Sequence, residues 1–146
     1  MASDRRLFFL LQRAARAAMG RANEVMIEAL GVSSSQLATL AYLAKRPRST
    51  LTDVANLFDL NKSGVSSMIT RLERAGLVKR EPSPRDGRAS LLSLTAKGEA
   101  VRAESVPLIR RATAEMTEGF TSAEVEVIYR FLSAIIEKCA GAEEEP

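Results

Sequence analysis

Apolar residues recur at helical spacing along most of the chain, and the alternation typical of strands occurs only between residues 77 and 94. The first apolar stripe predicts a long helix from Arg5 to Leu30, closed by Gly31. This basic, alanine-rich and acid-poor opening also suits an organellar transit peptide. In the helical interpretation the stripe faces partner helices, and it comprises Leu7, Leu11, Ala14, Ala18, Val25 and Met26.

Three further helices begin with capping boxes, in which Ser or Thr is followed three residues later by Gln, Asp or Glu. The first of them should end at Arg46-Pro47, because the residue before a proline disfavours the helical conformation. The second is expected to turn Val54, Leu57 and Phe58 inward. The three pairs are Ser33 with Gln36, Thr50 with Asp53, and Thr121 with Glu124.

A fourth helix follows Asn61, a favourable N-cap residue, and its apolar positions Val65, Met68, Ile69 and Leu72 form one buried face. The opposite face combines small hydroxyls with guanidiniums, which suits a helix lying in a DNA major groove. An ordinary solvated helix face is the competing interpretation, since surface helices are commonly rich in Ser and Arg. The opposite face carries Ser63, Ser66, Ser67, Thr70, Arg71 and Arg74.

A β-hairpin is predicted directly after this helix. Gly76 stands where a left-handed, helix-ending residue is expected, and strand-like segments follow at residues 77–81 and 89–94. The connection, residues 82–88, contains two prolines, an Asp-Gly turn dipeptide, and Arg85 and Arg88. The hairpin therefore reads as the wing of a winged helix-turn-helix, which touches neighbouring backbone or the minor groove.

Two helices are predicted after the hairpin. Thr95 caps a long one, and Pro107 within it predicts a kink or a break near Glu104. The apolar face of the last helix is too extensive for a free helix end, so we expect it to pack on the first helix of a second subunit. That face comprises Val125, Ile128, Phe131, Leu132, Ile135 and Ile136.

Composition fits one soluble domain of 146 residues, of which 46% are hydrophobic and 5% aromatic. The net charge is +3 but unevenly spread. Residues 61–90 hold seven basic and three acidic side chains, a net of +4, whereas residues 115–146 hold eight acidic and two basic ones, a net of −6. This asymmetry predicts one electropositive face for phosphates and an acidic end directed away from it.

The absence of histidine excludes Ser-His-Asp and Cys-His catalytic centres and His-ligated metals. No motif singles out a carboxylate pair, so the sequence predicts no enzyme, no metal and no cofactor. The single cysteine, Cys139, excludes an intrachain disulfide and fits a reducing compartment such as the cytoplasm. No apolar run is long enough for a signal sequence or a membrane span.

Three segments, residues 71–78, 84–89 and 92–98, resemble the signature of the MarR family of bacterial transcription regulators. The Asp-x-Arg wing tip followed at fixed spacing by Leu-x-Leu-Thr-x-x-Gly is specific, and the order of helices fits nearly the whole chain. The resemblance implies a homodimer on double-stranded DNA, often relieved by a small aromatic or phenolic ligand. The expected fold is mainly α with a β-hairpin wing: dimerisation helices at 1–31 and 95–140, a winged-helix lobe at 33–94 and an acidic tail at 141–146 of a single domain.

We therefore predict a repressor that binds a pseudo-palindromic operator. A winged helix serving protein-protein contacts is the alternative, and the basic helix face argues against it. By resemblance, Arg88 enters the minor groove and Asp86 orients its guanidinium, while Arg16, Met19, Asn23 and Tyr42 are candidate effector contacts. The predicted DNA contacts are Asn61, Lys62, Ser63, Ser66, Ser67, Thr70, Arg71, Arg74, Arg85, Asp86 and Arg88.

Overall fold

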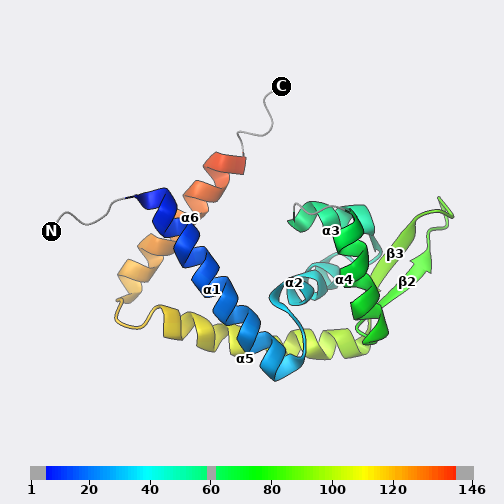
Figure 1. Cartoon of the computed structure of the whole chain (residues 1–146), viewed down its shortest axis with the longest axis horizontal. Coiled ribbons are helices and arrows are strands. Elements are labelled where there is room, and N and C mark those ends of the chain that lie inside the picture. The colour runs from blue at the N-terminus through cyan, green and yellow to red at the C-terminus, as the bar shows by residue number, and fades with distance from the viewer. Residues whose placement is uncertain (1–5, 59–61, 141–146) are drawn as a thin grey trace. The chain divides into compact units, whose positions relative to one another are not determined.

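The computed structural model describes residues 6–58 and 62–140. The chain divides into two units, residues 1–109 and residues 110–146, and helix α5, Ala96–Met116, belongs partly to each (Figure 1). The architecture is mainly helical with one small antiparallel sheet, as predicted. No helix in the described ranges is both long and apolar enough to cross a bilayer.

The first two helices begin and end close to where the sequence predicts. α1 spans Leu7–Leu30 and ends at Gly31, whose φ of 69° is left-handed and whose amide donates to the Ile27 carbonyl. α2 spans Ser34–Lys45 and opens with the complete Ser33–Gln36 capping box.

The helix-turn-helix consists of α3, Leu51–Phe58, and α4, Lys62–Arg74. The Thr50–Asp53 capping box opens α3. Val54 is fully buried, but Leu57 is 44% exposed, so its predicted inward position is wrong. The buried face of α3 is centred between Val54 and Ala55, and the 3.6-residue period places Leu57 outside it.

A tight turn leads from α4 into the sheet. Gly76 has a φ of 74°, its amide donates to the Glu73 carbonyl, and the Leu77 amide donates to the Leu72 carbonyl. These two bonds form a Schellman motif, which satisfies the last carbonyls of the helix. The predicted role of Gly76 is thereby confirmed.

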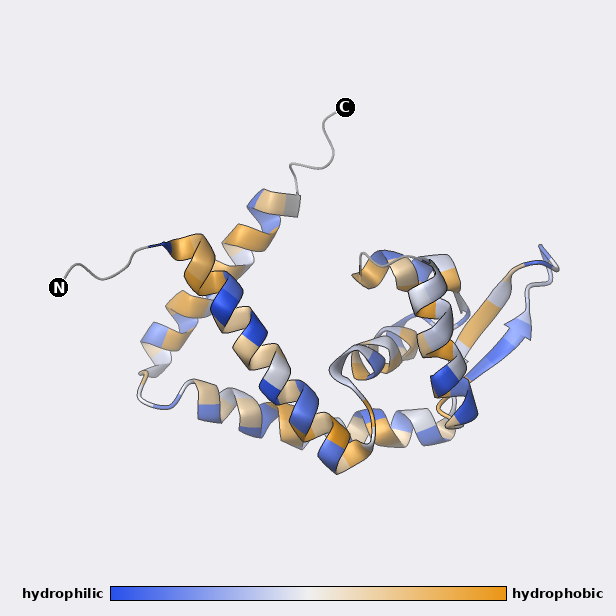
Figure 2. Ribbon diagram, viewed as in Figure 1, coloured by the Kyte–Doolittle hydropathy of each residue, from blue (hydrophilic) through white to orange (hydrophobic). Residues whose placement is uncertain are grey.

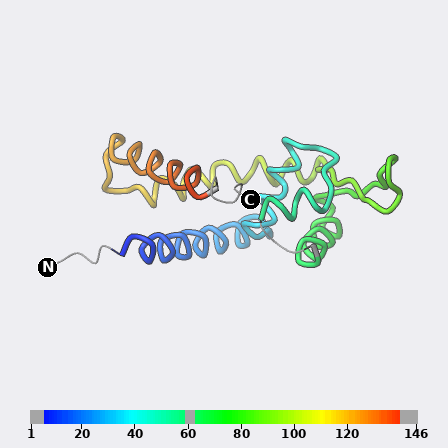
Figure 3. Tube along the Cα trace, turned by 90° about the horizontal axis from the view of Figure 1, so that it is seen from above, coloured from blue at the N-terminus to red at the C-terminus, as the bar shows by residue number. Residues whose placement is uncertain are grey.

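The wing consists of β2, Val78–Pro82, and β3, Ser90–Leu94, paired antiparallel with Arg80 opposite Leu92. The hairpin extends away from the helices of the first unit (Figure 3). A strand that the sequence did not predict, β1 at Ser49–Thr50, pairs with the other edge of β3. Two residues are too few to show alternation, which explains why the pattern missed this strand.

The buried hydrophobic residues all belong to the first unit, between residues 26 and 92. They come from α1 to α4, from the sheet and from the connections at Val32 and Leu77, so the helix-turn-helix and its wing share one core. The residues are Met26, Val32, Leu37, Leu40, Leu43, Val54, Ala55, Val65, Ile69, Leu72, Leu77, Val78 and Leu92.

The start of α5 is bonded to the end of α4. The Thr95 hydroxyl accepts from the Gly98 amide at 3.0 Å and donates to the Gly76 carbonyl at 2.6 Å, while Lys97 Nζ donates to the Ala75 carbonyl at 2.9 Å. The helix continues through Pro107 to Met116, so the predicted break does not occur.

The second unit contains α6, Ser122–Ala140, opened by the Thr121–Glu124 capping box. Its side chains are apolar over much of the helix, as are the first turns of α1 (Figure 2). In the single chain this face is uncovered: Phe131 and Leu132 are 40% exposed and Ile136 is 68% exposed. The exposure agrees with the expectation that a partner covers α6.

Candidate nucleic-acid interface

The outer face of α4 carries the hydroxyls and guanidiniums that the sequence placed there. Val65, Ile69 and Leu72 are fully buried and fix the orientation of the helix. Asn61 lies outside the described residues, and the side chain of Lys62 is likewise not described. The remaining six predicted residues line one surface depression, the α4 hollow: Ser63, Ser66, Ser67, Thr70, Arg71 and Arg74.

The wing tip is shaped by side chain to backbone hydrogen bonds. The Ser83 hydroxyl accepts from the amides of Arg85 and Asp86 at 3.3 and 3.4 Å. Asp86 Oδ1 accepts from the Arg88 amide at 3.0 Å. These bonds build Ser and Asx turns, in which short polar side chains stabilise a tight loop.

Asp86 thus contacts the backbone of Arg88, whereas the resemblance implied a contact with its guanidinium. No ion pair joins the two side chains, both of which lie within the described part of the chain. Asp86 can still position Arg88, because fixing the amide of a residue fixes where its side chain starts. The two side chains are exposed, as an interface for a large partner requires.

The described arginines on α4 and at the wing tip share one property, which is that none of them forms an ion pair. Among the described residues, no acid lies within ion-pair distance of Arg71, Arg74, Arg85 or Arg88. Four arginines elsewhere have acidic partners: Arg21 with Glu24 at 3.5 Å, Arg48 with Glu81 at 3.6 Å, Arg102 with Glu99 at 2.6 Å, and Arg111 with Glu115 at 3.0 Å. Others, such as Arg13 and Arg130, have none in the described part of the chain.

Unpaired guanidiniums gathered on α4 and the wing are available to phosphates and base edges. None of these four guanidiniums is engaged in an ion pair within the described residues, which favours attraction of a polyanion. Glu73, the one acid on the described part of α4, points to the wing: its carboxylate lies 3.4 Å from Arg80 Nε, near enough for an ion pair but not aligned as a hydrogen bond.

Sequence reasoning missed a pocket between α1, α2 and α5, which we call the helix pocket. Its walls are apolar, with Met26, Leu37 and Val106 among them, and its polar groups come from Ser34, Arg102 and Ser105. The Ser34 hydroxyl is buried and has no hydrogen-bond partner among the described residues. A buried hydroxyl without a partner is unfavourable, so it suits a ligand that supplies one.

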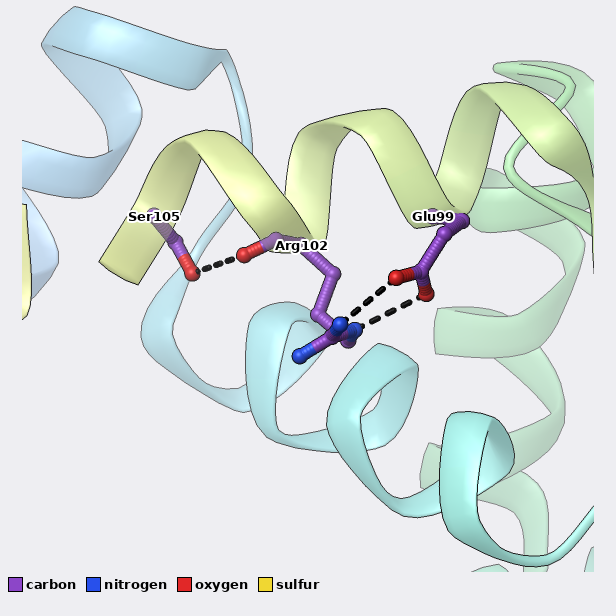
Figure 4. A network of polar contacts seen from close by, with 3 residues as sticks. All are labelled: Glu99, Arg102 and Ser105. Atoms are coloured by element: carbon purple, nitrogen blue, oxygen red, sulfur yellow. Dashed lines mark hydrogen bonds and ion pairs between the residues drawn. The ribbon is translucent and has the colours of Figure 1, made fainter. Parts of the chain in front are cut away.

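Arg102 is held at this pocket by Glu99 one turn earlier (Figure 4). Nε and Nη2 of Arg102 donate to the two carboxylate oxygens at 2.8 and 2.6 Å. These bonds lower the pKa of Glu99 and raise the pKa of Arg102, so both groups stay charged. The i, i+3 spacing of Glu99 and Arg102 could have indicated this pair in advance.

None of the four predicted effector residues lines the helix pocket. Arg16 and Met19 are exposed on α1, and Tyr42 is half-buried beneath the Arg46 guanidinium, 5.2 Å from its ring centre. Asn23 contacts a residue that does line the pocket, since its Oδ1 accepts from the Ser34 amide at 3.0 Å. Their effector role stays a prediction.

Comparison with known proteins finds similarity to transcriptional regulators of the MarR family. The model of the MarR family matches residues 30–89. The regulator BilQ of Clostridioides difficile is 27% identical over 106 residues, covering 73% of this chain and 72% of that protein. The repressor MdtR of Bacillus subtilis is 29% identical over 119 residues, covering 82% and 76%.

Solved structures show the same fold. A crystal structure of MarR superposes with a TM-score of 0.80 at 22% identity and covers 98% of both chains. Bordetella bronchiseptica BpsR superposes with a TM-score of 0.78 at 24% identity, covering 92% of this chain and 96% of that one, and its DNA binding is described as regulated by 6-hydroxynicotinic acid.

Proposed function

We propose that the chain is a winged-helix transcriptional regulator of the MarR family, which its sequence and fold resemble, and that it represses transcription by binding a pseudo-palindromic DNA operator as a homodimer. α4 enters the major groove with the residues of the α4 hollow, and the wing places Arg88 at the adjacent minor groove. The observation that carries this proposal is the set of four guanidiniums on α4 and the wing tip that have no acidic partner in the described chain.

Two identical recognition helices require two-fold symmetry of the site. The uncovered apolar faces of α1 and α6 support a dimer, because isolated helices with such faces are stable only when a partner covers them. The half-sites should be centred about one helical turn, or roughly 10 base pairs, apart. Repression then follows if the operator overlaps a promoter.

The test of DNA binding is selection of a duplex from genomic fragments, followed by titration at several salt concentrations. We expect sequence-specific binding whose logarithmic affinity falls linearly with the logarithm of salt concentration. The double variant Arg71→Ala, Arg74→Ala should lose this binding, while Arg111→Ala, which removes a paired arginine, should keep it. No sequence preference, or binding only to an acidic protein, would contradict the proposal and support the protein-interaction alternative.

The test of assembly is light scattering at micromolar concentration together with a footprint of the selected duplex. We expect a dimer and two symmetric protected half-sites. A folded monomer, or a footprint over a single half-site, would contradict the symmetric arrangement.

We also propose that a small aromatic acid releases the protein from DNA by binding in the helix pocket. Apolar walls suit a ring, the Ser34 hydroxyl suits a polar substituent, and the Arg102 guanidinium suits a carboxylate. Binding would exchange the Glu99 carboxylate for that of the ligand. Because α5 is bonded through Thr95 and Lys97 to the end of α4, a shift of α5 would move the recognition helix.

A panel of monocyclic aromatic acids tests this effector role by calorimetry and by DNA titration. The acid that binds should weaken DNA binding by the wild type, and Arg102→Met should abolish the response while retaining DNA binding. Arg21→Met, which removes an ion-paired arginine away from the helix pocket, serves as the control. An unchanged response in Arg102→Met would exclude the pocket as the effector site.

A further inference from the structure

A second depression on the first unit, the wing hollow, lies where the start of α3 meets the strands of the wing. Residues far apart in the sequence line it: Thr52 from the first turn of α3, Arg80 from β2, Asp86 and Arg88 from the connecting loop, and Ser90 from β3. Only Asp86 and Arg88 were among the DNA contacts predicted from the sequence. The other three converge here because β1 pairs with β3 and so brings the start of α3 beside the wing.

The groups in the wing hollow suit a phosphate. Two guanidiniums and two hydroxyls supply hydrogen-bond donors, and guanidinium forks match the geometry of phosphate oxygens. The one carboxylate, that of Asp86, accepts from the Arg88 amide at 3.0 Å, so it is engaged in the turn. The lining of the hollow therefore carries two positive charges and one negative charge, and Glu73 pairs with Arg80 from outside the lining.

The terminal nitrogens of Arg80 are available as hydrogen-bond donors. Glu73 approaches its Nε at 3.4 Å, and no described residue pairs with its two terminal nitrogens. The side chain is 26% exposed, so its stem is packed and its position is defined. Arg88 has no acidic partner among the described residues, and its guanidinium is likewise available.

We propose that the wing hollow binds one backbone phosphate of the operator, held by Arg80 together with the hydroxyls of Thr52 and Ser90, at the base of the loop from which Arg88 extends to the minor groove. This inference rests on the proposed DNA binding and adds a contact outside α4 that fixes the wing on the duplex. A phosphate contact of this kind positions the protein without reading sequence. Thr52 and Arg80 thus become phosphate-binding residues.

The first experiment places a negative charge in the wing hollow. Thr52→Glu puts a carboxylate in the first turn of α3, where it favours the helix and so preserves the fold. We expect affinity for the selected duplex to fall about tenfold, because one phosphate contact is lost and repulsion replaces it. Ser122→Glu is the matched control: it makes the same charge change in the first turn of α6, at an exposed residue after an identical capping threonine.

The second experiment identifies the phosphate. Single neutral methylphosphonate groups are introduced along the selected duplex, and each duplex is titrated with wild type and with Arg80→Gln. At one position in each half-site we expect the wild type to lose affinity and Arg80→Gln to show no further loss, with its salt slope lower by about one unit. Arg80→Gln also loses its contact with Glu73, whereas Thr52→Glu leaves that contact intact, so the two variants separate folding from phosphate binding.

The outcomes separate this inference from the proposed function. If the wild type selects no duplex, DNA binding itself fails. The wild type can instead select a duplex while Thr52→Glu binds it as well as Ser122→Glu does and every methylphosphonate weakens Arg80→Gln and wild type equally. In that case only the proposed contact between the wing hollow and an operator phosphate is overturned. Inorganic phosphate that competes at matched ionic strength with the wild type, but not with Thr52→Glu, would assign the hollow to a free phosphate and overturn the operator contact.

Discussion

The winged-helix lobe and helix α6 begin their helices with the same device and then differ in what covers them. Thr50 with Asp53 opens α3, and Thr121 with Glu124 opens α6. The lobe buries most of its apolar residues within one chain, whereas six large apolar side chains of α6 remain 37% to 68% exposed. Capping decides that a helix forms, but burial requires a covering surface, and only the lobe supplies its own.

The two regions differ in charge as well. Residues 61–90 carry a net charge of +4, and the arginines of α4 and the wing tip have no acidic partners in the described chain, whereas residues 115–146 carry a net charge of −6. The lobe therefore presents free cations and a closed core, and α6 presents an open apolar face in an acidic segment. This difference indicates two kinds of partner: a polyanion for the lobe and an apolar surface for α6.

The largest expected effect comes from the lobe core. Leu40→Ala removes a fully buried side chain and should lower the free energy of unfolding by about 2 to 5 kcal/mol at every protein concentration. Ile136→Ala changes a side chain that is 68% exposed, so any loss should grow or shrink with protein concentration through the dimer. Urea unfolding at two protein concentrations checks both. A concentration-independent loss in Ile136→Ala would mean that the chain covers α6 itself.

The second effect concerns glycines. A Cβ on Gly98 would clash with the Leu77 carbonyl oxygen, so Gly98→Ala should lower the free energy of unfolding by about 1 to 3 kcal/mol. Gly20 in α1 has open space around it in the single chain, and Gly20→Ala should raise the free energy of unfolding by roughly 0.5 to 1 kcal/mol. Thermal unfolding measures both. Destabilisation by Gly20→Ala would show that a partner packs against α1 at this point.

The sequence predicted most of the helices because each has a local signal. Capping boxes, the glycines at the ends of α1 and α4, and 3.6-residue periodicity are properties of adjacent residues, and the structure confirms them. The wing was predictable for the same reason, since alternating strands flank a turn dipeptide. The outer face of α4 followed from the position of its buried face.

What the sequence did not predict depends on contacts between distant segments. β1 has only two residues and exists because β3 offers an edge. The helix pocket and the wing hollow join residues from three or more elements, so no spacing rule locates them. Pro107 was expected to kink or break α5 near Glu104, and the break does not occur, because α5 continues from Ala96 to Met116.

The third effect tests the charge difference between the regions. Arg88→Ala should weaken operator binding by about 1 to 3 kcal/mol and lower the salt slope by about one unit. Arg111→Ala makes the same change in net charge at a paired arginine of the second unit and should leave affinity nearly unchanged. Fluorescence titrations with the selected duplex measure both; equal losses would mean that total charge, and not the wing, governs binding.

Asp86 sharpens the same test. Asp86→Asn keeps an oxygen that can accept from the Arg88 amide, so it should bind at least as well as Asp86→Ala. If Asp86 positions Arg88 through its backbone, Asp86→Ala weakens binding and adds little to Arg88→Ala in the double variant. Tighter binding by Asp86→Ala, or strict additivity, would contradict this role.

The smallest expected effect is the acid dependence of the two capping boxes. Asp53 Oδ2 accepts from the Thr50 amide and hydroxyl at 2.7 and 2.8 Å, and these hydrogen bonds lower the pKa of Asp53; Thr121 lowers the pKa of Glu124 in the same way. A depressed folded-state pKa stabilises the protein above the unfolded-state pKa, and this contribution is lost as pH falls through the folded-state value.

Asp53→Asn removes that titration, so stability should drop by less than about 1 kcal/mol at neutral pH and decline less steeply with acid. Glu124→Gln should do the same only where a partner covers α6 and joins it to the cooperative unit. Unfolding measured from about pH 7 to about pH 3 at high and low protein concentration distinguishes these cases. If Glu124→Gln reduces the acid dependence of stability equally at both protein concentrations, α6 is stable alone.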